Sequence, residues 1–114
     1  MDSILNSIKK LLGITEEYKH FDQDIIIHIN SVFSILRQIG VGPEEGFVIK
    51  DNTSTWNEFI DDEIKLESVK SYVYLKVRLI FDPPSSSAAI DAIKQNISEL
   101  EWRLNVSNDT NERS

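Results

Sequence analysis

The chain has 114 residues, a formal net charge of −7 and no cysteine. This length suits one domain with one modest core, and the lack of cysteine excludes disulfides, thiolate metal sites and a cysteine nucleophile. The opening residues, MDSILNSIKK, place an acid before a short apolar stretch and lysines after it, the reverse of a secretory signal. The longest aliphatic run, residues 25–27, is far too short for a membrane span. We therefore expect a soluble protein made inside the cell, with no membrane partner.

The negative charge is concentrated in one segment. Residues 44–67 carry eight acids against Lys50 and Lys65, and so supply −6 of the net −7. Tight DNA binding needs a basic patch that releases counterions from phosphates, whereas the basic residues here are scattered, so no specific DNA binding is expected. The acids that form a candidate surface are Glu44, Glu45, Asp51, Glu58, Asp61, Asp62 and Glu63.

The first part of the chain predicts two helices. Residues 2–12 form a short amphipathic helix followed by Gly13, the residue type preferred just after a helix end. A second helix is expected over residues 22–39, with Asp22 as its N-cap and Gly40 at its end. The apolar stripe of this second helix is Ile25, Ile26, Ile29, Val32, Phe33 and Leu36.

The middle of the chain predicts a loop and a brief helix. Residues 44–53 hold one extended piece, Phe47-Val48-Ile49, which we expect to be a short β-strand in need of a partner. Thr55-Trp56-Asn57-Glu58 matches the pattern of a capping box. It predicts a brief helix that carries Trp56, Phe59 and Ile60.

The helix expected over residues 62–81 is apolar nearly all round, and Asp82-Pro83-Pro84 stops it. A surface helix shows only one apolar stripe, so part of the cover for this helix is expected from another chain. The second stripe should then be partly exposed in a single subunit. The first stripe is Leu66, Val69, Val73, Val77 and Ile80, and the second is Tyr72, Leu75 and Leu79, beside Tyr74.

A last helix is expected over about residues 87–105, capped by the serines at 85–87. Residues 105–114 are polar and are expected to be a flexible tail when free. The prediction is a mainly α protein: a small bundle of four to five helices, with a loop that contains a short β-strand or hairpin. Residues 1–104 form its single domain. The stripe of the last helix is Ile90, Ile93, Ile97, Leu100 and Leu104.

No enzyme, metal or cofactor signature is present in the sequence. His20 and His28 stand eight residues apart without a further ligand set, which favours ordinary structural or surface roles. Asp61-Asp62-Glu63 could attract a cation, but acids at a helix start already stabilise the helix dipole, so capping is the preferred interpretation. We expect no catalytic, metal-binding or cofactor-binding residue.

Apolar residues outside the expected stripes are candidates for subunit contacts. Trp102 lies about 200° around its helix from Leu100, at roughly 100° per residue, and tryptophan is enriched at interfaces. Trp56 opens a short helix beside the acidic segment, and Ile27 and Ile35 lie one above the other off the main stripe. The full set of subunit-interface candidates is Ile27, Ile35, Trp56, Tyr72, Tyr74, Leu75, Leu79 and Trp102.

Four segments together resemble the head–tail connector family of tailed bacteriophages, the small helical adaptor or head-completion proteins. These segments are KKLLGI, DIIIHINSVFSILRQIGVGPEEGF, YVYLKVRLIFDPPSSS and ISELEWRLNV. The resemblance covers roughly residues 5–105 and consists of apolar patterns and turn residues. The acidic loop at 50–63 and the tail after 105 are the least similar parts.

The resemblance implies a structural virion protein at the neck, assembled in the host cytoplasm. It would form a ring of identical subunits, dodecameric in the family, under the portal protein. The ring would extend the DNA channel without binding DNA specifically, and would join the head to the next neck or tail-completion protein. We hypothesise that part of the 44–63 loop faces the channel or that neck protein, because a negative wall keeps DNA from binding; a solvated outer loop is the equally favoured alternative. In the family the C-terminal end reaches toward the portal, and the candidate portal-binding residues are Arg103, Asn105, Val106 and Arg113.

The apolar faces fit a second class of protein equally well. A helical regulatory module of a host or prophage, such as an antitoxin-like adaptor, would also need apolar surfaces and would form a small fixed oligomer. A DNA-binding repressor is a weaker alternative, because no helix carries a row of Arg, Lys, Asn or Gln toward a groove. An enzyme is the least favoured reading.

Overall fold

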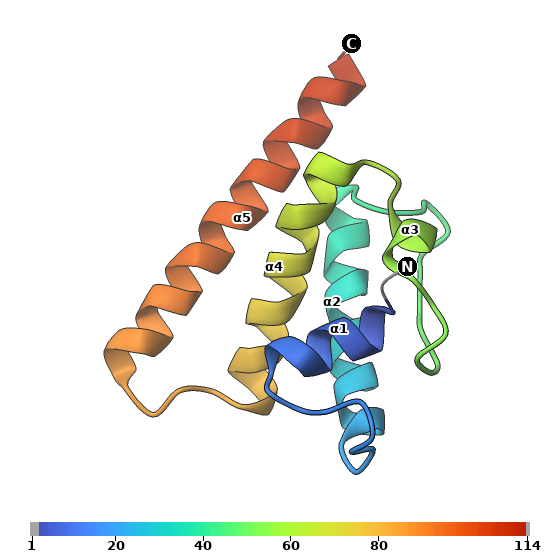
Figure 1. Cartoon of the computed structure of the whole chain (residues 1–114). Coiled ribbons are helices and arrows are strands. Elements are labelled where there is room, and N and C mark those ends of the chain that lie inside the picture. The colour runs from blue at the N-terminus through green and yellow to red at the C-terminus, as the bar shows by residue number, and fades with distance from the viewer. Residues whose placement is uncertain (1–2, 114) are drawn as a thin grey trace.

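The computed structural model describes the backbone of residues 3–113 and the side chains of residues 3–106. Over this range the chain is a small helical bundle with almost no β-structure, which confirms the predicted mainly α class (Figure 1). Within residues 3–113 a single antiparallel bridge joins Ser3 to Thr55. The helices are α1 (Ile4–Leu11), α2 (Asp22–Ile39), α3 (Trp56–Phe59), α4 (Glu63–Phe81) and α5 (Ser87–Arg113).

Helix α4 is the centre of the bundle. It packs against α2 on one side and against α5 on the other, while α1 crosses over α2 and α4 (Figure 1). The segment between α2 and α4, which contains α3, lies on the side of the bundle away from α5. Cover on two sides explains why the sequence of α4 is apolar nearly all round, since two neighbouring helices each require an apolar stripe on it.

The predicted stripe of the second helix is confirmed as core, and α1 adds three apolar residues to it, although Leu11 at the end of α1 is 51% exposed. Ile4, Leu5 and Ile8 of α1 are buried. All six residues of the predicted α2 stripe are buried as well, and Phe33 stacks on Phe59 with ring centroids 4.5 Å apart. Burial of one apolar side chain of this size contributes about 1.5–3 kcal/mol, so this stripe is a main source of stability.

The ends of the helices follow local chemistry. Gly13 and Gly40 have φ values of 83° and 95°, the left-handed conformation in which glycine avoids the penalty of a Cβ atom. The carboxylate of Asp62 accepts hydrogen bonds from the N–H groups of Ile64 and Lys65 and so caps α4. This agrees with the capping role that we preferred for the acid cluster at residues 61–63. Ser86 caps α5 through the Ala89 N–H at 3.3 Å.

Three local predictions about caps and strands are wrong. Asp22 is not an N-cap but the first residue of α2, because its carboxylate is engaged by Lys9 instead. Thr55 holds the N-cap position of α3 without a side-chain hydrogen bond, so the capping box is not formed. Residues 47–49 are not a strand, because the side chain of Asn30 satisfies the backbone of Ile49 in place of a partner strand.

Helix α5 is longer than the sequence suggested. It continues to Arg113 instead of ending near residue 105, and its C-terminal part extends past the start of α4 (Figure 1). The stretch after Leu104 contains no glycine or proline that would stop a helix. Whether residues 105–114 are mobile when free stays a prediction, as does the domain boundary at residue 104.

Candidate interaction surfaces

The C-terminal half of α5 presents the most exposed large hydrophobic side chain among the described residues of that helix. Trp102 is 68% exposed, and Val106 lies one turn further on the same side. Arg103 borders both the hollow beside Trp102 and a groove that leads to Ile64, at the start of α4, which is 87% exposed. We call Ile64, Trp102, Arg103 and Val106 the Trp102 face. The sequence-based choice of Trp102 as a surface residue agrees with this position.

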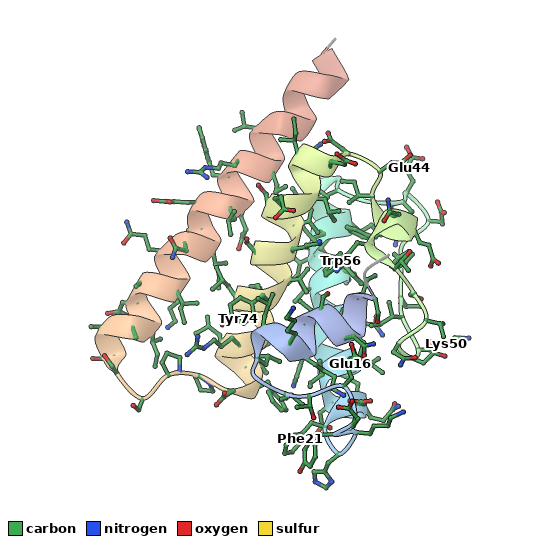
Figure 2. All side chains as sticks on the ribbon, in the orientation of Figure 1. Glu16, Phe21, Glu44, Lys50, Trp56 and Tyr74 are labelled. Atoms are coloured by element: carbon green, nitrogen blue, oxygen red, sulfur yellow. The ribbon has the colours of Figure 1, made fainter. Side chains whose placement is uncertain are left out.

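Trp56 is a core residue. Only 1% of it is exposed, and its indole Nε1 donates a hydrogen bond to the Ser7 hydroxyl at 2.8 Å (Figure 2). Its ring also lies against Phe33, with centroids 6.3 Å apart. Trp56 therefore offers no surface to a neighbouring subunit in this conformation, because α1 and the 41–60 segment fold over it.

The second stripe of α4 is covered to different degrees. Tyr72 is completely buried, so the expectation that it is partly exposed in a single chain is wrong. Leu75, Leu79 and Tyr74 are half-buried against the core, and the Tyr74 hydroxyl accepts a hydrogen bond from Arg78 at 3.0 Å. The cover comes from α5 of the same chain, so the apolar character of α4 by itself does not require another subunit.

The Tyr72 hydroxyl has an unusual environment. It makes no hydrogen bond of ordinary geometry among the described residues. Burial, then the negative charge of Glu101 and the approach of its carboxylate to the hydroxyl, raise the pKa of Tyr72 above its usual value. The hydroxyl therefore faces the Glu101 carboxylate of α5 inside the α4–α5 contact.

Other apolar residues outside the core are found on α2 and α4. Ile27 is 60% exposed, as its place off the stripe suggested, whereas Ile35 is half-buried against the core. Ile80, expected in the first stripe of α4, is 57% exposed in the last turn of that helix. Ile27 and Ile35 therefore form a smaller apolar surface than the sequence implied.

The acidic segment is a solvent-facing surface. All seven of its candidate residues are exposed, and they lie in the connection between α2 and α4 or at the start of α4. The hydrogen bonds that Thr53 donates to the Asp51 carboxylate lower the pKa of Asp51 below its usual value. These acids are therefore accessible to solvent, and Asp62 also caps α4.

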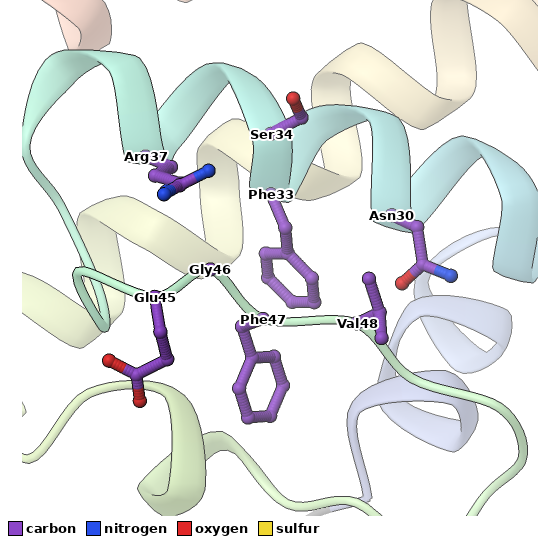
Figure 3. Close-up of a pocket in the computed structure, with 8 residues that line it drawn as sticks. All are labelled: Asn30, Phe33, Ser34, Arg37, Glu45, Gly46, Phe47 and Val48. Carbon is purple, nitrogen blue, oxygen red and sulfur yellow. The ribbon is translucent and has the colours of Figure 1, made fainter.

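A shallow pocket lies between α2 and the segment 45–48 (Figure 3). Its floor is formed by Phe33 and Phe47, whose rings meet edge to face at 5.4 Å. Arg37 closes one end by donating from Nε to the Glu44 carbonyl at 2.8 Å, and Asn30 closes the other. The pocket holds no set of catalytic groups, and its polar side chains are used to hold the loop on α2.

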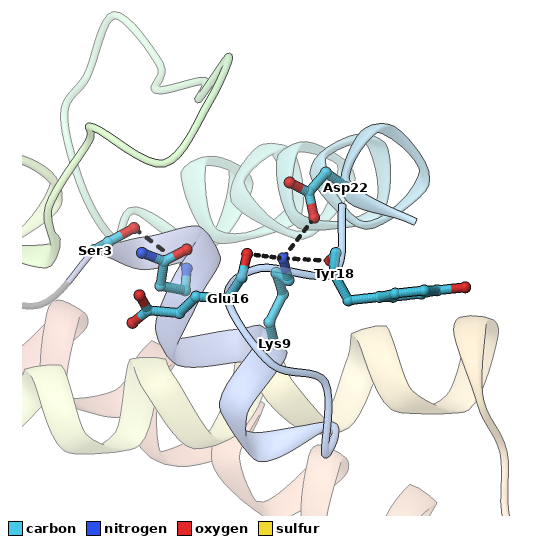
Figure 4. Close-up of polar contacts among 6 residues, drawn as sticks. Ser3, Lys9, Glu16, Tyr18 and Asp22 are labelled. Atoms are coloured by element: carbon cyan, nitrogen blue, oxygen red, sulfur yellow. Dashed lines mark hydrogen bonds and ion pairs between the residues drawn. The ribbon is translucent and has the colours of Figure 1, made fainter. Parts of the chain in front are cut away.

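Lys9 has a structural role that we did not predict from the sequence. Its ammonium is buried and donates to the carbonyl oxygens of Glu16 and Tyr18 at 3.1 and 2.8 Å, and it pairs with the Asp22 carboxylate at 2.8 Å (Figure 4). One side chain thus holds the connection between α1 and α2. Its burial could have been predicted from its position four residues after Leu5, which places it on the apolar side of α1.

An apolar groove opens where that connection meets the end of α4. It measures about 360 Å³ and is lined by Leu12, Ile14, Phe21, Phe81 and Asp82, which we call the Phe21 groove. The Phe21 and Phe81 rings meet edge to face at 5.2 Å, and Tyr18 lies beside Phe21 at 5.7 Å. The sequence did not indicate this groove, because its walls come from three separate parts of the chain.

The portal-binding candidates lie in the C-terminal part of α5. Arg103 and Asn105 are exposed, and Val106 is partly so. The side chain of Arg113 lies outside the described residues. Arg103 borders the same hollow as Trp102 and therefore belongs to the Trp102 face. It lies apart from the C-terminal end of α5.

No three histidine or acidic side chains gather into a possible metal site in the described part of the chain. Nor does any helix within residues 3–113 have the length and apolarity needed to cross a membrane.

The sequence matches the family model described as phage connector protein over residues 4–111. The matched range runs from the first residue of α1 almost to the end of α5. Neither the curated proteins nor the solved structures include a match to this chain.

Proposed function

Because this chain belongs to the phage connector protein family, we propose that it forms a ring of identical subunits under the portal of a packaged phage head. Its general role is that of a structural connector protein of a phage, and the family is one of virion components and not of enzymes. The ring would extend the DNA channel and join the head to the next neck or tail-completion protein. The family match over residues 4–111 is the observation that carries this proposal.

The distribution of exposed apolar residues supports a ring. A closed ring uses head-to-tail contacts, so each subunit needs two different contact surfaces. The Trp102 face lies on α5 and the start of α4, whereas the Phe21 groove lies at the α1–α2 connection and the end of α4. The two surfaces occupy opposite ends of the bundle (Figure 1).

The acidic segment suits a channel wall. DNA must slide through the ring, and a negative surface keeps its phosphates from binding. We place the 44–63 segment at the lumen or against the next neck protein, because all of its candidate acids are exposed and the α3-containing connection that carries most of them lies on the side of the bundle away from α5. The C-terminal end of α5, from Asn105 on, is the part that we assign to the portal.

The test is assembly with the portal protein encoded in the same genome. Co-expression followed by sedimentation and negative-stain microscopy should show rings seated on the portal. A chain truncated after Leu104 loses the last part of α5 but should keep the helical signal of the remaining residues and its thermal unfolding, while it loses co-sedimentation. A small fixed oligomer without portal affinity would contradict the connector function and favour a regulatory module.

The lumen assignment has its own test. Replacement of Glu44, Glu45 and Asp61 by lysine should slow DNA ejection from assembled phage, while Asp62 is left in place because it caps α4. The matched control replaces three exposed acids elsewhere, Glu16, Glu17 and Asp91, and should leave ejection unchanged. Equal ejection rates in the two triple variants would remove the lumen assignment without affecting the ring itself.

A further inference from the structure

The fold leaves one exposed aromatic face and one apolar groove without an occupant from the described residues. The Trp102 face projects a large ring from α5, and that ring is 68% exposed. The Phe21 groove is hollow, about 360 Å³, and is walled by half-buried aliphatic and aromatic side chains. Tryptophan and arginine are among the residue types enriched at the energetic centres of interfaces.

We propose that the Trp102 face of one subunit docks into the Phe21 groove of the next copy of this chain. Trp102 enters the groove and lies against the Phe21 and Phe81 rings, which already meet edge to face at 5.2 Å. Aromatic rings favour such edge-to-face and offset contacts over direct stacking. This inference rests on the proposed ring and names the two surfaces that would build it.

Charge complementarity selects a second copy as the occupant. Arg103 borders the Trp102 hollow and Asp82 lines the Phe21 groove. Both are exposed, and neither side chain has a hydrogen bond or an ion pair among the described residues. When Trp102 enters the groove of a neighbour, the guanidinium of Arg103 meets the carboxylate of Asp82. An arginine–carboxylate pair adds orientation as well as attraction.

The contact is heterologous because the two surfaces differ and lie at separate places in the fold. Repetition of such a contact gives a ring where the rotation closes and an open filament where it does not, whereas a contact of one surface with itself gives only a dimer. The two kinds of assembly therefore leave different signatures in a cross-linking experiment. The natural chain has no cysteine, so each introduced thiol reports on its own position alone.

The experiment is disulfide cross-linking of the full chain, free at high concentration and docked on the portal protein of the same genome. The double variant Glu99→Cys with Ile14→Cys keeps Trp102 and should give a ladder of dimers, trimers and higher species on a non-reducing gel, because Glu99 lines the hollow beside Trp102. Each single variant should stay monomeric, as should Glu99→Cys with Val48→Cys, since Val48 is exposed on the acidic segment. A dimer from Glu99→Cys alone, or no ladder from the double variant in either state, overturns the proposal.

A charge exchange checks the same contact without thiols. Arg103→Asp and Asp82→Arg should each weaken self-association by at least about ten-fold, and the double exchange should restore it. If Trp102→Ala and Arg103→Asp abolish portal binding but leave ring contacts intact, the face belongs to the portal and the proposal fails. Rings on the portal without the ladder refute this interface alone, while the absence of rings in the unmodified protein refutes the proposed function.

Discussion

The side-chain amide of Asn30 makes two hydrogen bonds to the backbone of Ile49. Its Nδ2 donates to the Ile49 carbonyl oxygen at 3.0 Å, and its Oδ1 accepts from the Ile49 N–H at 2.8 Å. An extended backbone needs partners for these groups, and here one amide on α2 supplies both. Because Ile49 is buried, this pair fixes the acidic loop to the core.

We predict that Asn30→Ala lowers the free energy of unfolding by about 1–3 kcal/mol, because it leaves a buried N–H and carbonyl unpaired. Urea unfolding followed by circular dichroism measures the change. Ser31→Ala is the matched control, since its exposed hydroxyl donates only to the Ile27 carbonyl, and it should cost less than about 0.5 kcal/mol. Equal losses in the two variants would contradict the role of Asn30.

The Lys9 site predicts a larger effect. Lys9→Met leaves the Asp22 carboxylate and two carbonyl oxygens without their cation, so the free energy of unfolding should fall by about 3 kcal/mol. Lys10 is its exposed neighbour on the same helix, and Lys10→Met should be close to neutral. Thermal unfolding of both variants distinguishes a specific buried contact from a general effect of lost charge.

Tyr72 predicts a pH dependence. Its pKa is raised in the folded state, so above the ordinary pKa near 10 the unfolded chain loses the phenol proton first. The contribution of the protonated Tyr72 to the free energy of unfolding is therefore complete below about pH 10 and is lost as the pH rises above it. Tyr72→Phe should remove this part of the alkaline loss of stability and be neutral or stabilising at pH 7. Tyr18→Phe, at an exposed tyrosine, should leave the pH profile unchanged.

The two tryptophans should behave differently in fluorescence quenching. Trp102→Phe leaves the buried Trp56, whose emission should be blue-shifted and resistant to iodide, and should cost less than about 0.5 kcal/mol. Trp56→Phe leaves the exposed Trp102, which should be quenched readily, and should cost about 1–3 kcal/mol because the hydrogen bond to Ser7 is lost. Similar quenching in both variants would contradict the assigned burial.

Helix α4 shows where sequence-based reasoning reached its limit. Because α4 is apolar nearly all round, the sequence correctly indicated that other segments pack against it on several sides. It did not indicate whether those segments belong to the same chain. Burial of Tyr72 under α5 shows that the same chain supplies much of that cover. Periodicity reports how many faces of a helix are apolar, whereas the identity of the partner depends on contacts between distant segments.

The sequence by itself determined the helices and most of the core. Apolar spacing located α1, α2, α4 and α5, and Gly13 and Gly40 marked helix ends because their conformations depend only on neighbouring residues. Only the tertiary structure decided the contacts that place the loops: Asn30 with Ile49, Lys9 with Asp22, and Trp56 with Ser7. These partners lie 13 to 49 residues apart, and side chains so far apart meet only after the helices have packed, so no local pattern encodes them.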